Sequence, residues 1–122
     1  DDLIPEVKID CELNLADITF ELIDEINRLS PFGAVNPMPV LTSRNVELRS
    51  INFIGKEANH VRFKVLQENT LRDVIAFNMR SAIENKVKNG DLVDIVYEAS
   101  VNEWHGNENI QLKLTDISIS NE

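Results

Sequence analysis

The stretch between residues 46 and 119 constrains the fold most, because it is a series of short β-type segments with one helical interruption. Within residues 60–67, the apolar Val61, Phe63 and Val65 alternate with polar neighbours. Strict alternation of this kind is typical of a strand with one buried face. Comparable patterns predict four further strands, over residues 46–55, 71–78, 92–104 and 110–119.

The helical interruption falls between the third and fourth of these strands. Ser81-Ala82-Ile83-Glu84 is typical of a capping box that begins a helix, and Asn89-Gly90 is typical of a helix end. Three strands, a helix and two strands is the order of an oligonucleotide/oligosaccharide-binding (OB) barrel. Register shifts between Leu48 and Ile51, and again in the last strand, are the bends that a small closed barrel needs.

We therefore predict a mainly β fold with two parts. Residues 46–122 form a five-stranded OB-fold barrel with one short helix. Residues 1–45 form a linker segment that contains a strand, a helix and a Pro-rich connector. The connector at residues 31–39 holds three of the four prolines and is expected to be stiff.

The linker segment carries its own apolar patterns. Alternation across residues 7–13 predicts a strand that places Cys11 on the apolar side, as a small core residue. Apolar residues from Ile18 to Leu29 recur at helical spacing, and Asp17 or Thr19 can cap that helix. With one cysteine in the chain, no internal disulfide can form, which fits a reducing, cytoplasmic location.

The net charge of −9 argues against a nucleic-acid ligand in general, but the charge is unevenly spread. Residues 1–45 carry three basic and nine acidic side chains, a net of −6. Residues 46–122 carry nine basic and twelve acidic side chains, a net of −3. The barrel is therefore close to balance, and a local basic face on it is possible.

Nothing in the sequence marks a catalytic centre, so we predict no catalytic and no metal-binding residues. The two histidines, His60 and His105, are far apart and belong to no metal-binding motif. There is no nucleophile elbow and no glycine-rich phosphate loop. No apolar run approaches the roughly 18 residues that span a bilayer, so we expect no membrane partner.

Binding evidence is stronger than catalytic evidence. OB barrels bind single strands across the face of their second and third strands, where cations contact phosphates and aromatic rings stack on bases. Here the outward side of residues 60–67 is polar and mostly basic. The candidate DNA-binding residues are Arg49, Lys56, His60, Arg62, Lys64, Arg72, Trp104 and His105. Alternatively, the cations form an ordinary solvated strand face, and the tryptophan covers an open end of the barrel.

The Pro-rich connector, Pro-Phe-Gly-Ala-Val-Asn-Pro-Met-Pro at residues 31–39, carries a family resemblance. It resembles the Pro-Phe-Gly-x-Gly-Asn-Pro-x-Pro-x-Phe element of bacterial RecJ, the 5′→3′ single-strand-specific exonucleases of the DHH phosphoesterase superfamily. Ile-Ala-Phe-Asn at residues 75–78 and Trp-x-Gly at 104–106 extend the similarity. Val35 and Leu41 depart from the glycine and phenylalanine that the family usually has.

The resemblance implies the C-terminal OB-fold region of such an enzyme, a hydrolase of DNA repair and recombination. The family's Asp-His-His catalytic motifs and glycine-rich nucleotide-binding motif precede this region and are missing here, which implies an excised, non-catalytic piece. Mn²⁺ or Mg²⁺ would serve the whole enzyme, with no cofactor in this part. Implied partners are single-stranded DNA, the upstream catalytic core, and single-strand-binding protein or other repair proteins.

Two other functions remain open. A barrel edge can accept a strand from a partner, and an acidic surface suits a basic partner, so the chain is alternatively a protein-interaction module. A free-standing enzyme is the third hypothesis, and it would require activity from this chain alone.

Overall fold

The computed structural model describes residues 11–29 and 38–120. The first part of the predicted N-terminal strand and most of the Pro-rich connector lie outside these ranges. A short strand β1 (Cys11–Glu12), a 3₁₀ turn η2 (Leu15–Asp17) and helix α1 (Phe20–Asn27) precede the barrel. The barrel elements are β2 (Leu41–Ile54), β3 (His60–Gln67), β4 (Thr70–Ala76), α2 (Arg80–Glu84), β5 (Leu92–Trp104) and β6 (Asn107–Ile119).

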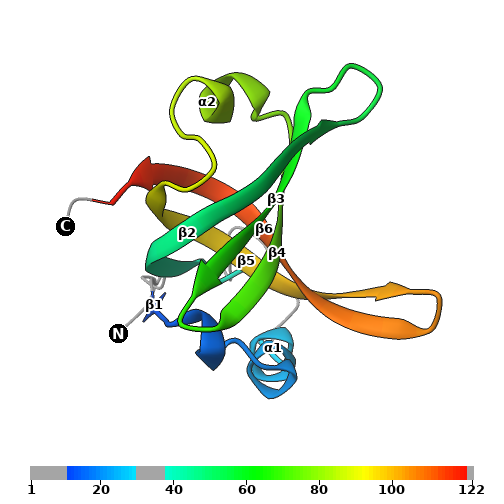
Figure 1. Ribbon diagram of the computed structural model, residues 1–122. Coiled ribbons are helices and arrows are strands. Elements are labelled where there is room, and N and C mark those ends of the chain that lie inside the picture. Colours follow the sequence, from blue (N-terminus) through cyan, green and yellow to red (C-terminus); the bar gives the residue numbers. More distant parts are fainter. Residues whose placement is uncertain (1–10, 30–37, 121–122) are drawn as a thin grey trace.

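The five long strands close into a barrel, with β1 added at one edge (Figure 1). Strand order is β1-β2-β3-β4-β6-β5, and a second pairing between β2 and β5 closes the cylinder. All barrel pairings are antiparallel except that of β4 with β6, which is parallel. The predicted fold class, a mainly β OB-fold barrel with a short helix after its third strand, is confirmed.

The first barrel strand is longer than the sequence pattern indicates. It begins at Leu41, not at residue 46, because residues 41–43 pair with β5 before the register shifts at Asn45. Asn45 has a positive φ of 56°, which breaks the alternation that a sequence pattern relies on. The predicted boundary after residue 45 thus falls inside β2, and the division into two parts stays a prediction.

The expected bends are present. The pairing of β2 with β3 shifts between Arg49 and Asn52, where Ser50 has a φ of 56°, and this confirms the predicted bulge. The pairing of β5 with β6 shifts where Tyr97 meets Leu114, which confirms the second one. These shifts let long strands curve around a narrow cylinder.

The prediction that the capping box at residues 81–84 begins the helix is wrong. Helix α2 begins at Arg80, its N-cap is Met79, and no side chain caps it, so Ser81 lies inside the helix. The helix also ends at Glu84, well before Asn89. Its place is set by burial of Ile83, which is fully covered, and not by local capping chemistry.

Of the predictions made for the N-terminal elements, the structure confirms the helix cap and contradicts the burial of two residues. Thr19 caps α1, because its Oγ1 accepts the backbone N–H of Leu22 at 3.1 Å. Leu29, predicted on the buried stripe, is 54% exposed, since only Ile23 and Ile26 of the helix are buried. Cys11 is exposed, not in the core, because β1 is a two-residue strand at the sheet edge.

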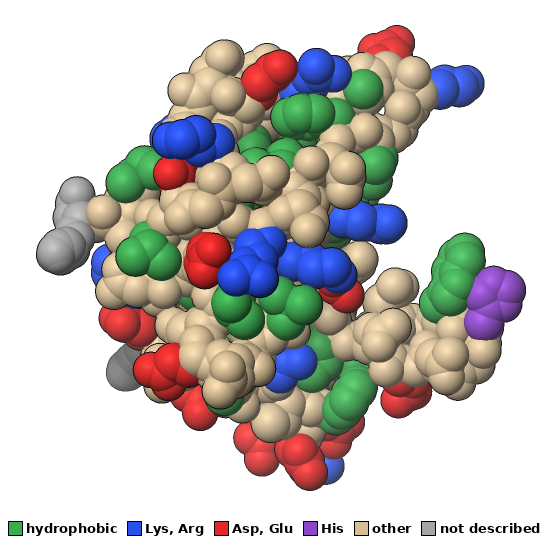
Figure 2. Space-filling view, viewed as in Figure 1, with side chains coloured by type: hydrophobic (Ala, Val, Ile, Leu, Met, Phe, Trp, Pro, Cys, Tyr) green, Lys and Arg blue, Asp and Glu red, His purple; other side chains and the backbone are tan. Residues whose placement is uncertain are grey.

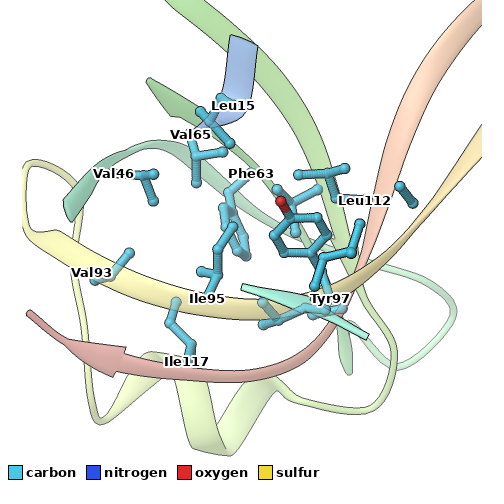
Figure 3. Packing of buried hydrophobic residues seen from close by; sticks show 14 of the residues in the cluster. Leu15, Val46, Phe63, Val65, Val93, Ile95, Tyr97, Leu112 and Ile117 are labelled. Carbon is cyan, nitrogen blue, oxygen red and sulfur yellow. The ribbon is translucent and has the colours of Figure 1, made fainter. Parts of the chain in front are cut away.

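One continuous core fills the barrel and extends under the N-terminal elements (Figure 3). Leu15 and Ile18 are fully buried in the same cluster as Phe63 and Tyr97. The Tyr97 hydroxyl contacts Ser43 Oγ at 2.7 Å, and Ser43 Oγ donates to the carbonyl oxygen of Leu13 at 2.8 Å. This chain of bonds ties the N-terminal segment to the barrel through polar groups as well as apolar ones.

Candidate nucleic-acid interface

Two hairpins extend beyond the barrel on the same side, one between β2 and β3 and a longer one between β5 and β6 (Figure 1). We call residues 100–111 of the longer hairpin the β5–β6 arm. Figure 2 shows a hollow between the two hairpins, with Lys and Arg side chains gathered at its base. A pocket of about 460 Å³ on this side is lined by Arg62, Lys64, Asp73, Asn102, Trp104, Asn109 and Gln111.

Strand register explains why these residues face the pocket together. Residues that pair directly across strands point to the same face of a sheet. Lys64 pairs with Asp73, which in turn pairs with Gln111, so these three form one row on the outer face. Arg62 belongs to the next row, opposite Ile75. Alternation along β3 predicted this outward side correctly, since the intervening Val61, Phe63 and Val65 are buried.

The two central cations are not equivalent. Lys64 Nζ forms an ion pair with Asp73 Oδ1, so a carboxylate offsets its charge inside the pocket. Arg62 is exposed, and no carboxylate within the described ranges pairs with it. Arg62 is therefore the cation of the pocket that is available to a phosphate.

The two flanking arginines lie on different faces. Arg49 pairs with Lys64 and shares the outer face, where its Nε lies 3.4 Å from a carboxylate oxygen of Glu47. Arg72 does not extend this row, which corrects its expected placement. It pairs with the buried Val65, and its Nη2 donates to the carbonyl oxygen of Ile18 at 2.8 Å. Arg72 and Asp73 are adjacent in the chain, and adjacent residues of a strand point to opposite faces of the sheet.

His60 lies at the other end of the outer face, beside the β2–β3 turn. Its Nδ1 accepts the backbone N–H of Asn78 at 2.9 Å, and its ring meets Phe77 edge-on at 5.4 Å between centroids. His60 is thus held in place, while Phe77 is 50% exposed and offers the freer ring. Lys113 Nζ lies 6.0 Å from the centroid of the Phe77 ring. Lys56 is exposed in the nearby turn, along a separate pocket of about 220 Å³.

Trp104 and His105 occupy the tip of the β5–β6 arm. Trp104 is 66% exposed, and the two rings meet edge-on with centroids 4.7 Å apart. His105 and Gly106 form the whole turn, since β6 begins at Asn107, whereas the sequence suggested a turn through residue 109. Both turn residues have positive φ, 52° and 81°, as a type I′ hairpin turn requires.

Sequence reasoning missed several residues that the fold brings to this face. Phe77 and Lys113 were not considered as binding residues, although Phe77 continues the outward alternation of Asp73 and Ile75. The amides Asn102, Asn109 and Gln111 were also missed. The alternation of side chains along a strand could have identified them, because it places every second residue of a long hairpin on one side.

Within residues 11–29 and 38–120, no group of three or more His, Cys, Asp or Glu side chains is placed to hold a metal ion. The described residues thus do not offer the converging donors of a divalent-metal centre. None of the helices in the described ranges is both long and apolar enough to cross a bilayer.

The comparisons with known proteins agree on one family for this chain. A family model described as the RecJ OB domain matches residues 9–116. The single-stranded-DNA-specific exonuclease RecJ of Bacillus subtilis is 34% identical over 120 residues, which cover 98% of this chain and 15% of that protein. The chain thus spans about a seventh of the length of this curated relative.

Two solved structures share the fold. RecJ from Thermus thermophilus, solved in complex with Mn²⁺, superposes with a TM-score of 0.59 at 18% identity, over 84% of this chain and 15% of that one. A mitochondrial single-stranded DNA binding protein from S. cerevisiae superposes with a TM-score of 0.51 at 14% identity, over 66% of this chain and 92% of that one. At these identities the likeness concerns the fold.

Proposed function

Because this chain belongs to the RecJ OB-domain family, we propose that its outer β3–β4–β6 face binds single-stranded DNA. The curated relative is named as a single-stranded-DNA-specific exonuclease, and a fold neighbour is a single-stranded DNA binding protein. The face that carries the pocket is also the one on which OB barrels generally bind oligonucleotides.

The observation that carries the proposal is that Arg62 and Trp104 line the same pocket. Arg62 is exposed with no carboxylate partner in the described part of the chain, and Trp104 is 66% exposed. A cation that contacts phosphate and a ring that stacks on a base are the two elements of sequence-tolerant single-strand binding. Arg49 and Lys64 add positive charge beside Arg62, reduced by their acidic neighbours.

Phe77 gives the proposed track a second aromatic platform. On β6, Lys113 beside Phe77 and Asn107 opposite Trp104 are six residues apart, or roughly 20 Å at about 3.3 Å per residue. A flexible single strand with splayed bases can follow such a face, whereas a stiff duplex keeps its bases stacked and paired. We infer that this track helps the whole protein to select single strands.

The activity of the whole protein belongs to the same proposal. We infer that the chain is part of a RecJ-like 5′→3′ exonuclease of DNA repair and recombination, in the cytoplasm. Hydrolysis, with Mn²⁺ or Mg²⁺, would take place in an upstream catalytic core, and the described residues would bind the strand without cleaving it. Single-strand-binding protein or other repair proteins are further proposed partners.

A charge-reversal experiment tests the proposed face. Arg62→Glu combined with Lys64→Glu should greatly weaken binding of a labelled oligothymidine, measured by fluorescence anisotropy at low salt. The matched control is Arg28→Glu combined with Lys88→Glu, which reverses one arginine and one lysine at exposed sites outside the pocket. Affinity that falls equally in both variants would show only a net-charge effect and would contradict the assigned face.

The single tryptophan provides a second readout, because Trp104 lines the pocket. Oligonucleotide binding should quench its fluorescence, and the quenching should decline as salt rises and counterion release becomes less favourable. A chain that acts only as a protein-interaction module would show neither response.

A further inference from the structure

The two faces of the β5–β6 arm carry different kinds of side chain. The rungs Ser100–Gln111, Asn102–Asn109 and Trp104–Asn107 share the face that lines the pocket. The rungs Val101–Ile110 and Glu103–Glu108 lie between them and therefore face the other way. Both carboxylates of the arm are thus on its back, in a chain whose net charge is −9.

The carboxylates of the back rung would be unfavourable next to any polyanion. Glu103 and Glu108 are directly opposite each other, a like-charge pairing that destabilises a hairpin. The pocket face of the arm instead combines uncharged polar side chains with one large ring. This face can accept nucleotides, while the back repels phosphates.

Three amides are available on the pocket face. No hydrogen bond to the side chains of Asn102, Asn109 or Gln111 is formed by any residue in the described ranges, and all three line the pocket. A primary amide presents a donor and an acceptor side by side, the arrangement that pairs with the edge of a nucleobase. Amides also contact phosphates, but unlike a cation an amide offers both a donor and an acceptor to the edge of a base.

Resting on the proposed function, we propose that the arm is a base-reading subsite that favours adenine over the pyrimidines. A base stacks on Trp104, its edge meets the amides of Asn102, Asn109 and Gln111, and the adjoining phosphate contacts Arg62. Binding would then depend on base identity, in addition to the sequence-tolerant contacts of the rest of the face.

Adenine is favoured because two of its edges match an amide. Its N6 amino group donates beside an acceptor on either side, N7 or N1, so an amide can pair with it in two orientations. Cytosine accepts an amide in one way, and thymine accepts it only along its Watson–Crick edge, whereas adenine accepts it on two separate edges. The larger purine ring also covers more of the exposed Trp104 ring.

The test compares oligothymidine with the same strand in which the central nucleotides are replaced by adenines or by cytosines. Dissociation constants come from fluorescence anisotropy at one salt concentration. We expect the adenine-containing strand to bind about fivefold tighter or more, the lower end of what one bidentate amide–adenine pair contributes. Equal affinity for the three strands would overturn the adenine preference and leave the proposed function standing.

Paired variants test whether a preference for adenine depends on the amides of the arm. Asn102→Ala with Asn109→Ala should bring the three affinities together, while Glu103→Gln with Glu108→Gln on the back should preserve their ratios. Circular dichroism checks that each variant is folded. Gln111→Ala repeats the test at the base of the arm, where β6 also pairs with β4 and where the residue is distant from the turn. An adenine preference that survives all the amide variants would refute the subsite. Absence of binding to any strand would refute the proposed function and the subsite together.

Discussion

Asp73 sets how much positive charge the pocket presents. Its carboxylate pairs with Lys64 on the neighbouring strand, so one of the two cations at the pocket base is largely compensated. An exposed pair of this kind adds little to stability, because both groups keep much of their hydration. Its main effect is therefore on the field that an approaching phosphate meets.

We predict that Asp73→Asn strengthens binding of single-stranded DNA severalfold, because it frees Lys64 and removes a negative charge from the pocket. Titration of a labelled oligothymidine at several salt concentrations measures the change, and the slope of log affinity against log salt should grow by about one phosphate contact. Asp24→Asn is the matched control, since Asp24 pairs with Arg28 on the exposed side of α1. Weaker binding by the Asp73 variant would contradict this role.

Folding alters the ionisation of Tyr97. Burial in the core raises the pKa of its hydroxyl from 10.0 to about 12, against the opposing effect of its hydrogen bond to Ser43. The unfolded chain therefore loses this proton at lower pH than the folded chain does. The contribution to stability is complete below pH 10 and is lost as pH rises from 10 through about 12.

We predict that Tyr97→Phe lowers the free energy of unfolding by about 1 kcal/mol near neutral pH, through loss of the bond to Ser43. The same variant should lose less stability than the wild type between pH 10 and 12. Urea unfolding followed by circular dichroism at several pH values tests both effects. As Tyr97 is the only tyrosine, tyrosinate absorbance reports its pKa directly. A midpoint near 10 in the folded protein would rule out the effect.

Among the elements, the β5–β6 arm depends on a two-residue turn. His105 adopts a left-handed conformation that non-glycine residues rarely take, although asparagine tolerates it well. Gly106 has a φ of +81°, and no atom lies within 4 Å of the position a Cβ would take, so backbone strain alone opposes a side chain there.

We predict that His105→Asn keeps the turn and raises stability by a few tenths of a kcal/mol, because Asn-Gly is the preferred type I′ pair. Gly106→Ala should instead destabilise the protein by about 1 kcal/mol. Thermal unfolding compares the two. The asparagine variant should also shift the emission of Trp104, which loses its contact with the imidazole ring. Equal destabilisation by both substitutions would show that the turn conformation is different.

Elements could be predicted from the sequence where burial alternates regularly. The limits of β3 and β5, and the outward direction of Arg62 and Lys64, follow from such alternation. The start of β2 could not be predicted, because its first residues are identified only by pairing with β5, between 52 and 56 residues away in the sequence. Likewise, Arg72 was misplaced because its direction depends on a register that only the neighbouring strands fix.

At the scale of the whole molecule, the N-terminal segment and the barrel share one core. Leu15, Ile18, Ile23 and Ile26 belong to the same buried cluster as the barrel residues, and Arg72 donates to the carbonyl of Ile18. The sequence identified both apolar sets but not their contact, because nothing local encodes which surface an amphipathic helix covers. The segment is thus more closely integrated than a linker would be.

We predict that the chain unfolds in one cooperative transition, with the segment and the barrel losing structure together. Urea titrations followed by circular dichroism and by hydrogen exchange of α1 and β3 amides should give the same midpoint. Ile23→Ala on α1 should lower both midpoints equally, since Ile23 is buried in the shared core. Separate midpoints would instead support the predicted division after residue 45.

The length of β5 and β6 has a mechanical meaning. Each strand is thirteen residues long and runs from the arm tip into the barrel wall, so the exposed tip and the buried base of the hairpin belong to the same two strands. A nucleotide chain reeled past Trp104 would pull on the exposed tip. The tension would pass along β5 to its pairing with β2, so pulling on the bound DNA would strain the pairing that closes the barrel.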